Sequence, residues 1–223
     1  MAVHGSNKSS KKINSGKKLP PINVLSIDFD WIMEPSIEAY NNIVKGDRMG
    51  PVRIWEQIHE IIPSFDPQCD LDKFHKLFFF LLYKGKDLTK NDIYVGMDHS
   101  EINFFLKDVN NNINLYNVDH HHDLGYPSGD DDDYAFSQLG VGNWVTFLNT
   151  EKKLNSYTWI HNKNSNHPRT KEINNLKTYS HSIDLAMLEH IKFDKIFICG
   201  SWEWVPLKYE SLFDILITVI DKN

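Results

Sequence analysis

Short apolar runs alternate along this chain with segments whose apolar residues recur at helical spacing. Runs of this length are typical of buried strands, and they lie at 22–29, 92–97, 113–119, 156–161 and 195–201. Helical spacing occupies the intervals 52–62, 70–85, 100–109, 143–153, 182–191 and 206–220. Strands that alternate with helices predict an α/β fold, a three-layer αβα arrangement around a mainly parallel sheet.

The first residues do not share this pattern. Residues 1–19 are polar, rich in Lys, Ser and Gly, and without periodicity, which is typical of a disordered tail. We expect the fold to begin near Pro20 and to form one domain over 20–223, because 223 residues with 41% hydrophobic content suit a single core. No internal repeat is evident.

Composition narrows the classes of partner and the compartment. The net charge of −6 predicts no basic face for nucleic acid. Two cysteines indicate no disulfide framework and favour a reducing cytoplasm. The longest apolar run, 77–83, is too short to cross a bilayer, and no hydrophobic signal core follows the basic start. We therefore expect a cytoplasmic protein that binds neither nucleic acid nor membrane.

Carboxylates and imidazoles follow four of the predicted strands. In parallel sheets, ligands bind beyond the carboxyl ends of the strands, so these side chains should share one rim. They are Asp28, Asp30, Asp98, His99, Asp119, His121, Asp123 and Glu203.

Extended backbone would turn alternate side chains the same way. On that basis Asp119, His121 and Asp123 point together, and Asp28 and Asp30 form a second pair. With His99 they make four carboxylates and two imidazoles, a donor set that suits a two-metal site for manganese or a similar divalent ion. Taken singly, the same segments also fit plainer interpretations: a solvated polar turn for 119–123, and helix caps for Asp28 and Asp98.

Three segments resemble the signatures of the arginase, or ureohydrolase, superfamily. The family segments are Gly-Gly-Asp-His-Ser, Asp-x-His-x-Asp and Ser-x-Asp-x-Asp-x-x-Asp-Pro. This chain has "GMDHS" at 96–100, "DHHHD" at 119–123 and "SIDFDWIMEP" at 26–35, with Glu34 where the family has Asp. The third segment comes last in ordinary arginases and first here, so the resemblance implies an arginase-like fold with permuted motif order.

The permuted order and the short chain resemble the peptide arginases of ribosomal peptide natural-product pathways. That resemblance implies a hydrolase acting on linear amidines, which converts arginine side chains of a precursor peptide to ornithine and releases urea. It implies two Mn²⁺ per chain, with Asp119 and Asp28 bridging. One ion would be held by His99, Asp119, Asp123 and Asp28, and the other by His121, Asp119, Asp28 and Asp30.

The resemblance also assigns catalytic roles. Asp98 or Asp30 would move a proton, and Glu203 would receive the guanidinium group. Arginases carry a further His on the loop after the Asp-x-His-x-Asp segment, where this chain has Asn143, a candidate substrate contact. The proton shuttle stays open between His122, His161 and His181. The acidic run at 128–134 would attract a basic peptide, or would be a solvated loop.

Two other functions remain open at this point. The first is hydrolysis of free arginine, agmatine or another small guanidino compound. The second is a metal-stabilised binding protein without turnover.

Overall fold

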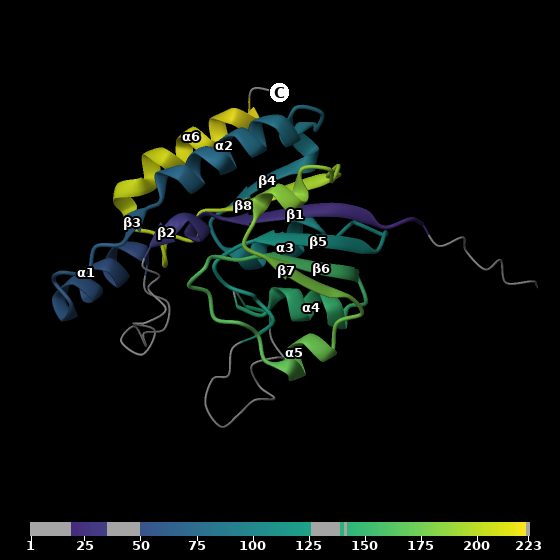
Figure 1. Ribbon diagram of the computed structural model, residues 1–223, viewed down its shortest axis with the longest axis horizontal. Coiled ribbons are helices and arrows are strands. Elements are labelled where there is room, and N and C mark those ends of the chain that lie inside the picture. The colour runs from purple at the N-terminus through teal and green to yellow at the C-terminus, as the bar shows by residue number, and fades with distance from the viewer. Residues whose placement is uncertain (1–18, 35–49, 126–138, 141, 222–223) are drawn as a thin grey trace, which may run out of the picture.

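The computed structural model describes residues 19–34, 50–125, 139–140 and 142–221 (Figure 1). The expected tail, apart from Leu19, and the acidic run at 128–134 lie outside these residues.

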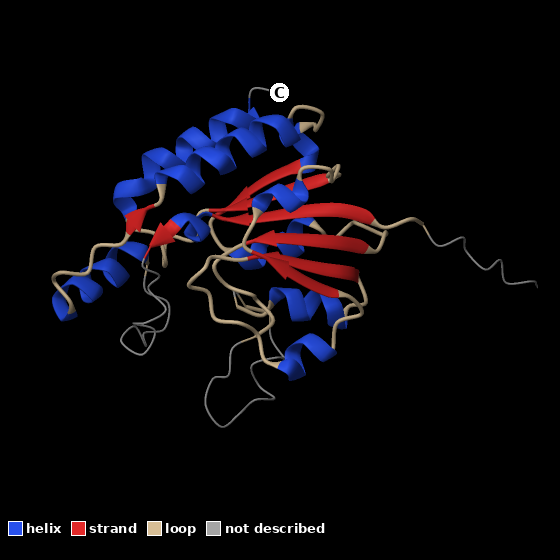
Figure 2. Ribbon diagram, viewed as in Figure 1, coloured by secondary structure: helices blue, strands red, loops and turns tan. Residues whose placement is uncertain are grey.

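A six-stranded, fully parallel sheet forms the centre of the molecule (Figure 2). Its order is β4-β8-β1-β5-β6-β7. The strands are β1 (Ile22–Asp28), β4 (Ile93–Gly96), β5 (Ile113–Val118), β6 (Leu154–Ile160), β7 (Tyr179–Ser182) and β8 (Lys195–Cys199). The predicted mainly parallel sheet is confirmed, and five of its strands lie at predicted runs. The sixth, β7, has the polar sequence Tyr-Ser-His-Ser and is an edge strand, so backbone pairing with β6 rather than apolar content defines it.

Helices flank the sheet, and a small antiparallel pair, β2 (Met33–Glu34) with β3 (Gln68–Cys69), lies beside it. The helices are α1 (Pro51–Ile61), α2 (Leu71–Gly85), α3 (Ile102–Phe105), α4 (Trp144–Thr150), α5 (Thr170–Asn174) and α6 (Glu210–Asp221). The helix predicted over 182–191 is wrong: only a 3-10 segment, Leu185–Leu188, forms there. Its two terminal leucines are buried, whereas Ile183 and Met187 are exposed, so a single turn covers the apolar positions that need burial.

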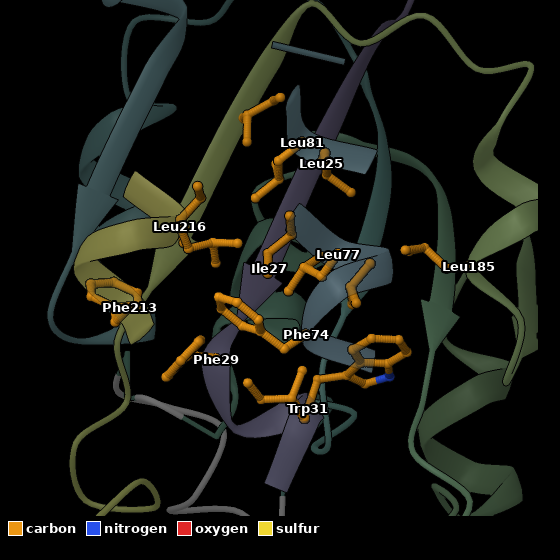
Figure 3. Close-up of a cluster of buried hydrophobic side chains, with 14 of the residues drawn as sticks. Leu25, Ile27, Phe29, Trp31, Phe74, Leu77, Leu81, Leu185, Phe213 and Leu216 are labelled. Carbon is orange, nitrogen blue, oxygen red and sulfur yellow. The ribbon is translucent and has the colours of Figure 1, made fainter. Parts of the chain in front are cut away.

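Two hydrophobic cores show why helices cover both faces of the sheet. Leu25 and Ile27 of β1 belong to the core that includes Leu77 of α2 and Leu216 of α6 (Figure 3). Val24, which points to the opposite face, packs in a second core. That core contains Ile102 of α3 and Trp144, Val145 and Leu148 of α4. Both faces are therefore apolar, as the continuous hydrophobic runs of buried parallel strands predict.

The core beneath α2 offers a test of the packing. Leu77 is fully buried, and Phe79 on the same helix is 63% exposed. We expect Leu77→Ala to lower the free energy of unfolding by about 2–5 kcal/mol, because it removes buried methyl groups and leaves a cavity. Phe79→Ala is the matched control and should change it by less than about 0.5 kcal/mol. Urea denaturation measures both, and equal effects would contradict this packing.

The register of the strands sets which residues share the rim. Asp28 is level with Cys199 of β8, which is level with Gly96 of β4. On the other side, Ile27 is level with Val118 of β5, so the residues that follow these strands emerge together. Among the described helices none is both long and apolar enough to span a membrane.

Candidate metal centre

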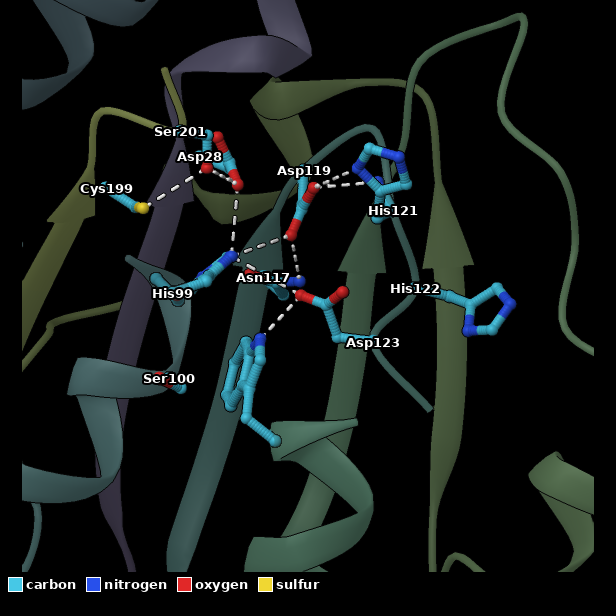
Figure 4. A network of polar contacts seen from close by, with 12 residues as sticks. Asp28, His99, Ser100, Asn117, Asp119, His121, His122, Asp123, Cys199 and Ser201 are labelled. Carbon is cyan, nitrogen blue, oxygen red and sulfur yellow. Dashed lines mark hydrogen bonds and ion pairs between the residues drawn. The ribbon is translucent and has the colours of Figure 1, made fainter. Parts of the chain in front are cut away.

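Six acidic and imidazole side chains meet at the carboxyl end of the central strands. Figure 4 labels Asp28, His99, Asp119, His121 and Asp123. Asp28 ends β1, and Asp30 lies in the 3-10 segment Phe29–Ile32 that follows. His99 begins the 3-10 turn after β4. Three more, Asp119, His121 and Asp123, follow β5. All six are at least nine-tenths buried, although each carries a group that can be charged.

The first group of ligand atoms surrounds His99. Its Nδ1 lies 3.1 Å from Asp28 Oδ2, 3.2 Å from Asp119 Oδ2 and 3.4 Å from Asp123 Oδ2. Its other nitrogen, Nε2, lies 2.7 Å from the hydroxyl oxygen of Ser26. When Nε2 carries a proton and donates it to Ser26, the lone pair of Nδ1 faces the three carboxylate oxygens, as it does in a metal ligand held by an outer partner.

The second group surrounds His121. Its Nδ1 lies 2.8 Å from Asp30 Oδ2 and 3.8 Å from Asp119 Oδ1. Asp119 therefore presents one carboxylate oxygen to each group. Asp28 does not do so: its Oδ1 accepts the backbone N–H of Asp30 at 3.1 Å, and only its Oδ2 faces the His99 group.

Turns, not extended backbone, bring these side chains together, so the expected alternation along a strand is wrong. β5 ends at Val118, and Asp119 Oδ1 then accepts the backbone N–H of His121 at 2.7 Å. Asp123 has a φ of 49°, a left-handed conformation that Asp tolerates better than most residues. Asp28 and Asp30 likewise lie at the start of a 3-10 segment.

Neighbouring donors orient three of the carboxylates. Asp123 Oδ2 accepts the indole N–H of Trp144 at 2.5 Å, and Asp28 Oδ2 accepts the hydroxyl of Ser201 at 2.6 Å. Asn117 donates its amide N–H to Asp119 Oδ2 at 3.0 Å.

Sequence reasoning missed these supporting residues. Trp144 also packs in the second core. Ser26 lies in the segment 26–35 that resembles an arginase signature, so the sequence did contain a signal for it. The sequence contained no such signal for Ser201 and Trp144, because each is distant in sequence from the carboxylate that it contacts.

The electrostatics of the centre call for added positive charge. Burial, then the charges of Asp28 and Asp119, raise the pKa of Asp30 to about 7. Burial and the charge of Asp119 raise the pKa of Asp123 well above its usual range. Burial opposes a charge on His99, yet its contacts with Asp119 and Asp28 raise its pKa. Asp30, Asp123 and His99 thus take up protons that a bound cation would replace, which fits a metal centre. Asp119 differs, because burial raises its pKa but the contacts with His99 outweigh this and lower it.

The donor types indicate which cations fit. Carboxylate oxygens with imidazole nitrogens suit Mn²⁺ and similar ions. The Cys199 thiol also lies beside the His99 group, with Sγ within 4.8 Å of a ligand atom of Asp28 and of His99, and burial and the charge of Asp28 raise its pKa. The chemistry of the described side chains therefore fits a pair of hard divalent cations that share Asp119.

The other predicted site residues, Asp98, Glu203 and Asn143, belong to neither group of ligand atoms. Asp98 caps the turn that carries His99, accepting the backbone N–H and hydroxyl of Ser100 at 2.7 and 2.6 Å. Glu203 lies in the turn after β8, and burial, followed by the charges of Asp98 and Asp28, raises its pKa. Asn143 precedes α4, and its side-chain oxygen accepts the N–H of Gly140 at 2.8 Å.

A hollow of about 680 Å³ lies elsewhere, between α2 and residues 183–190. Its lining includes Trp31, Phe79, Tyr83 and Leu185, but none of the six buried side chains of the centre. It is therefore separate from the chemistry described above.

Comparisons with protein-family models, with curated proteins and with solved structures found no match to this chain.

Proposed function

We propose that this protein is a binuclear manganese hydrolase that converts arginine side chains of a precursor peptide to ornithine with release of urea. The observation that carries the proposal is the position of Asp119, with one oxygen toward His99 and the other toward His121 and Asp30. A carboxylate shared between two groups of ligands can bridge a pair of closely spaced cations.

The resemblance to arginases supports the choice of reaction. The three segments that carry it supply all six buried side chains of the centre. The segment that is first in this chain forms the end of β1, between β5 and β8 in the sheet. This position is compatible with a permuted arginase-like connectivity, because a parallel sheet can be entered at another strand while its rim is retained.

The residues of this chain would bind the metal ions, orient the ligands and transfer a proton. His99, Asp28, Asp123 and Asp119 would hold one Mn²⁺, and Asp30, His121 and Asp119 the other. When bound, the two ions would lower the pKa of a water molecule toward neutrality and so supply the nucleophile. Ser26, Ser201 and Trp144 would keep the ligands oriented. Asp30 or Asp98 would move the proton to the departing amine.

Glu203 is the carboxylate best suited to receive the guanidinium. A guanidinium group stays charged at any working pH and pairs with carboxylates. Burial is the main cause of the raised pKa of Glu203, and the negative charges of Asp98 and Asp28 add to it, so a cationic substrate beside Glu203 would offset both. The neighbouring Trp204 ring lies 4.8 Å from the His121 ring and offers an aromatic face at the edge of the centre.

A mass measurement tests the proposal. Protein loaded with Mn²⁺ is incubated with a peptide that contains one arginine. We expect the peptide to lose about 42 Da, the mass change of hydrolysis of arginine to ornithine and urea. The same peptide with lysine in place of arginine is the control and should keep its mass.

The other outcomes identify the alternatives. Urea from free arginine or agmatine, with unchanged peptides, would replace the proposal by a small-molecule ureohydrolase. Manganese binding without turnover of any of these compounds would indicate a metal-stabilised binding protein.

A further inference from the structure

A second cluster of imidazoles lies on the same rim, one strand away from the carboxylate centre. His161 follows β6, His181 is in the edge strand β7, and His167 belongs to the loop between them. One ring nitrogen from each lies within 4.8 Å of the other two. The ring centroids are 4.7 Å apart for His161 and His167, 5.1 Å for His167 and His181, and 5.4 Å for His161 and His181.

Backbone pairing explains how distant segments meet here. Ile160 at the end of β6 is level with Ser182 of β7, and the backbone N–H of His161 continues the ladder to Ser182 O at 2.8 Å. His167 precedes Pro168, which is buried. A residue before proline is restricted to extended conformations, so the buried ring of Pro168 helps to hold His167 in place.

The buried member of the cluster is already oriented as a ligand. His161 is 7% exposed, and its Nδ1 lies 2.8 Å from the backbone carbonyl oxygen of Asn162. A carbonyl can only accept, so Nδ1 carries the proton and the lone pair of Nε2 faces the cluster. Zinc-bound histidines commonly donate their second ring N–H to a backbone carbonyl in this way.

Two further contacts hold this arrangement. The side-chain amide N–H of Asn162 donates to the backbone oxygen of Trp31 at 3.0 Å. This bond fixes Asn162, whose own backbone carbonyl orients His161. The ring of His161 packs against Trp159, with the ring centroids 4.7 Å apart.

One of the three nitrogen–nitrogen separations already matches a zinc site, and the other two are no more than 4.8 Å. Four ligands at the usual Zn–N distance in a tetrahedron are separated from one another by about 3.3–3.4 Å. His161 Nε2 and His181 Nδ1 are 3.3 Å apart. His167 and His181 are exposed, so a fourth position would face solvent.

We propose that His161, His167 and His181 form a second cation site that binds Zn²⁺, separate from the carboxylate centre. Within the part of the chain that the structure describes, no carboxylate joins this group, and three neutral nitrogens favour zinc and later first-row ions over manganese. The two sites therefore differ in the metal that each prefers. This inference does not depend on the proposed hydrolysis.

Zinc titration of the full chain tests the site. The protein is first loaded with Mn²⁺, and Zn²⁺ binding is measured in competition with a chromogenic chelator. We compare wild type with His167→Gln and His181→Gln, which alter exposed side chains. The matched control is His75→Gln, an exposed histidine of α2 outside the cluster.

We expect one class of zinc site to weaken at least tenfold in both cluster variants and to be unchanged in His75→Gln. Loss of an outer partner alone costs 10–100-fold in affinity, and these changes remove direct ligands. Histidine ring ¹⁵N signals of wild type should shift for the three cluster residues on zinc addition. Unchanged zinc affinity in both cluster variants, or zinc-dependent shifts confined to His99 and His121, would overturn the proposal.

Discussion

Asp119→Ala is expected to bind neither manganese ion and to lose turnover at least about 10³-fold, because several kcal/mol of metal-assisted stabilisation disappear with the ions. Asp119 is fully buried and is the side chain with one oxygen in each group of ligands. Its removal leaves each group short of a carboxylate, so both ions should be lost together. Metal content per chain, measured by elemental analysis after gel filtration, reads the result directly.

Two comparisons make this test specific. Asp108→Ala, at an exposed aspartate, should keep both ions and full activity. Asp119→Asn retains the shape of the side chain but removes its charge. Circular dichroism shows whether each variant is folded. A folded Asp119→Ala protein that still holds two manganese ions would show that Asp119 does not join two sites.

Glu203→Ala is expected to keep both metal ions and to lose about thirtyfold or more in kcat/KM for the arginine peptide. Removing one partner of a desolvated, hydrogen-bonded charge pair costs about 2–5 kcal/mol, which corresponds to a loss of this size. Glu203 belongs to neither group of ligand atoms, and it lies where the charges of Asp98 and Asp28 act on it. The metal content of this variant should therefore stay at the wild-type level while its activity falls.

The control for Glu203 is Glu151→Gln, which changes an exposed glutamate after α4 and should leave activity unaltered. Glu203→Gln should lower kcat/KM as much as Glu203→Ala does. The amide keeps the size of the side chain but lacks the charge that pairs with guanidinium. Full activity of Glu203→Ala would remove Glu203 from the substrate site. Loss of metal in the same variant would assign it to the metal centre instead.

Local pattern predicted much of the fold, and its failures have physical causes. The apolar runs located five strands, because a strand buried on both faces needs hydrophobic residues at nearly every position. The edge strand β7 escaped detection since its backbone pairs while its side chains remain polar or exposed. The segment 182–191 carries apolar residues at helical spacing, yet only Leu185 and Leu188 among them are buried, and one 3-10 turn suffices.

The six acidic and imidazole residues of the centre were visible because they follow strands in short clusters. What the clusters could not show was the path of the chain. The pattern suggested extended backbone for 119–123, but the Asp119 carboxylate accepts a backbone N–H within its own turn, and Asp123 takes a left-handed conformation. The side chains converge through these turns.

By itself the sequence determined the alternation of strands and helices and the placing of carboxylates and imidazoles after the strands, since both are properties of local residue order. Only the tertiary structure decided which of these side chains face one another. The parallel register brings Asp28 level with Cys199 and carries His161 to the edge strand that holds His181. Contacts such as Trp144 with Asp123 and Ser201 with Asp28 join residues far apart in the chain. The hydrophobic pattern along the sequence cannot predict such contacts.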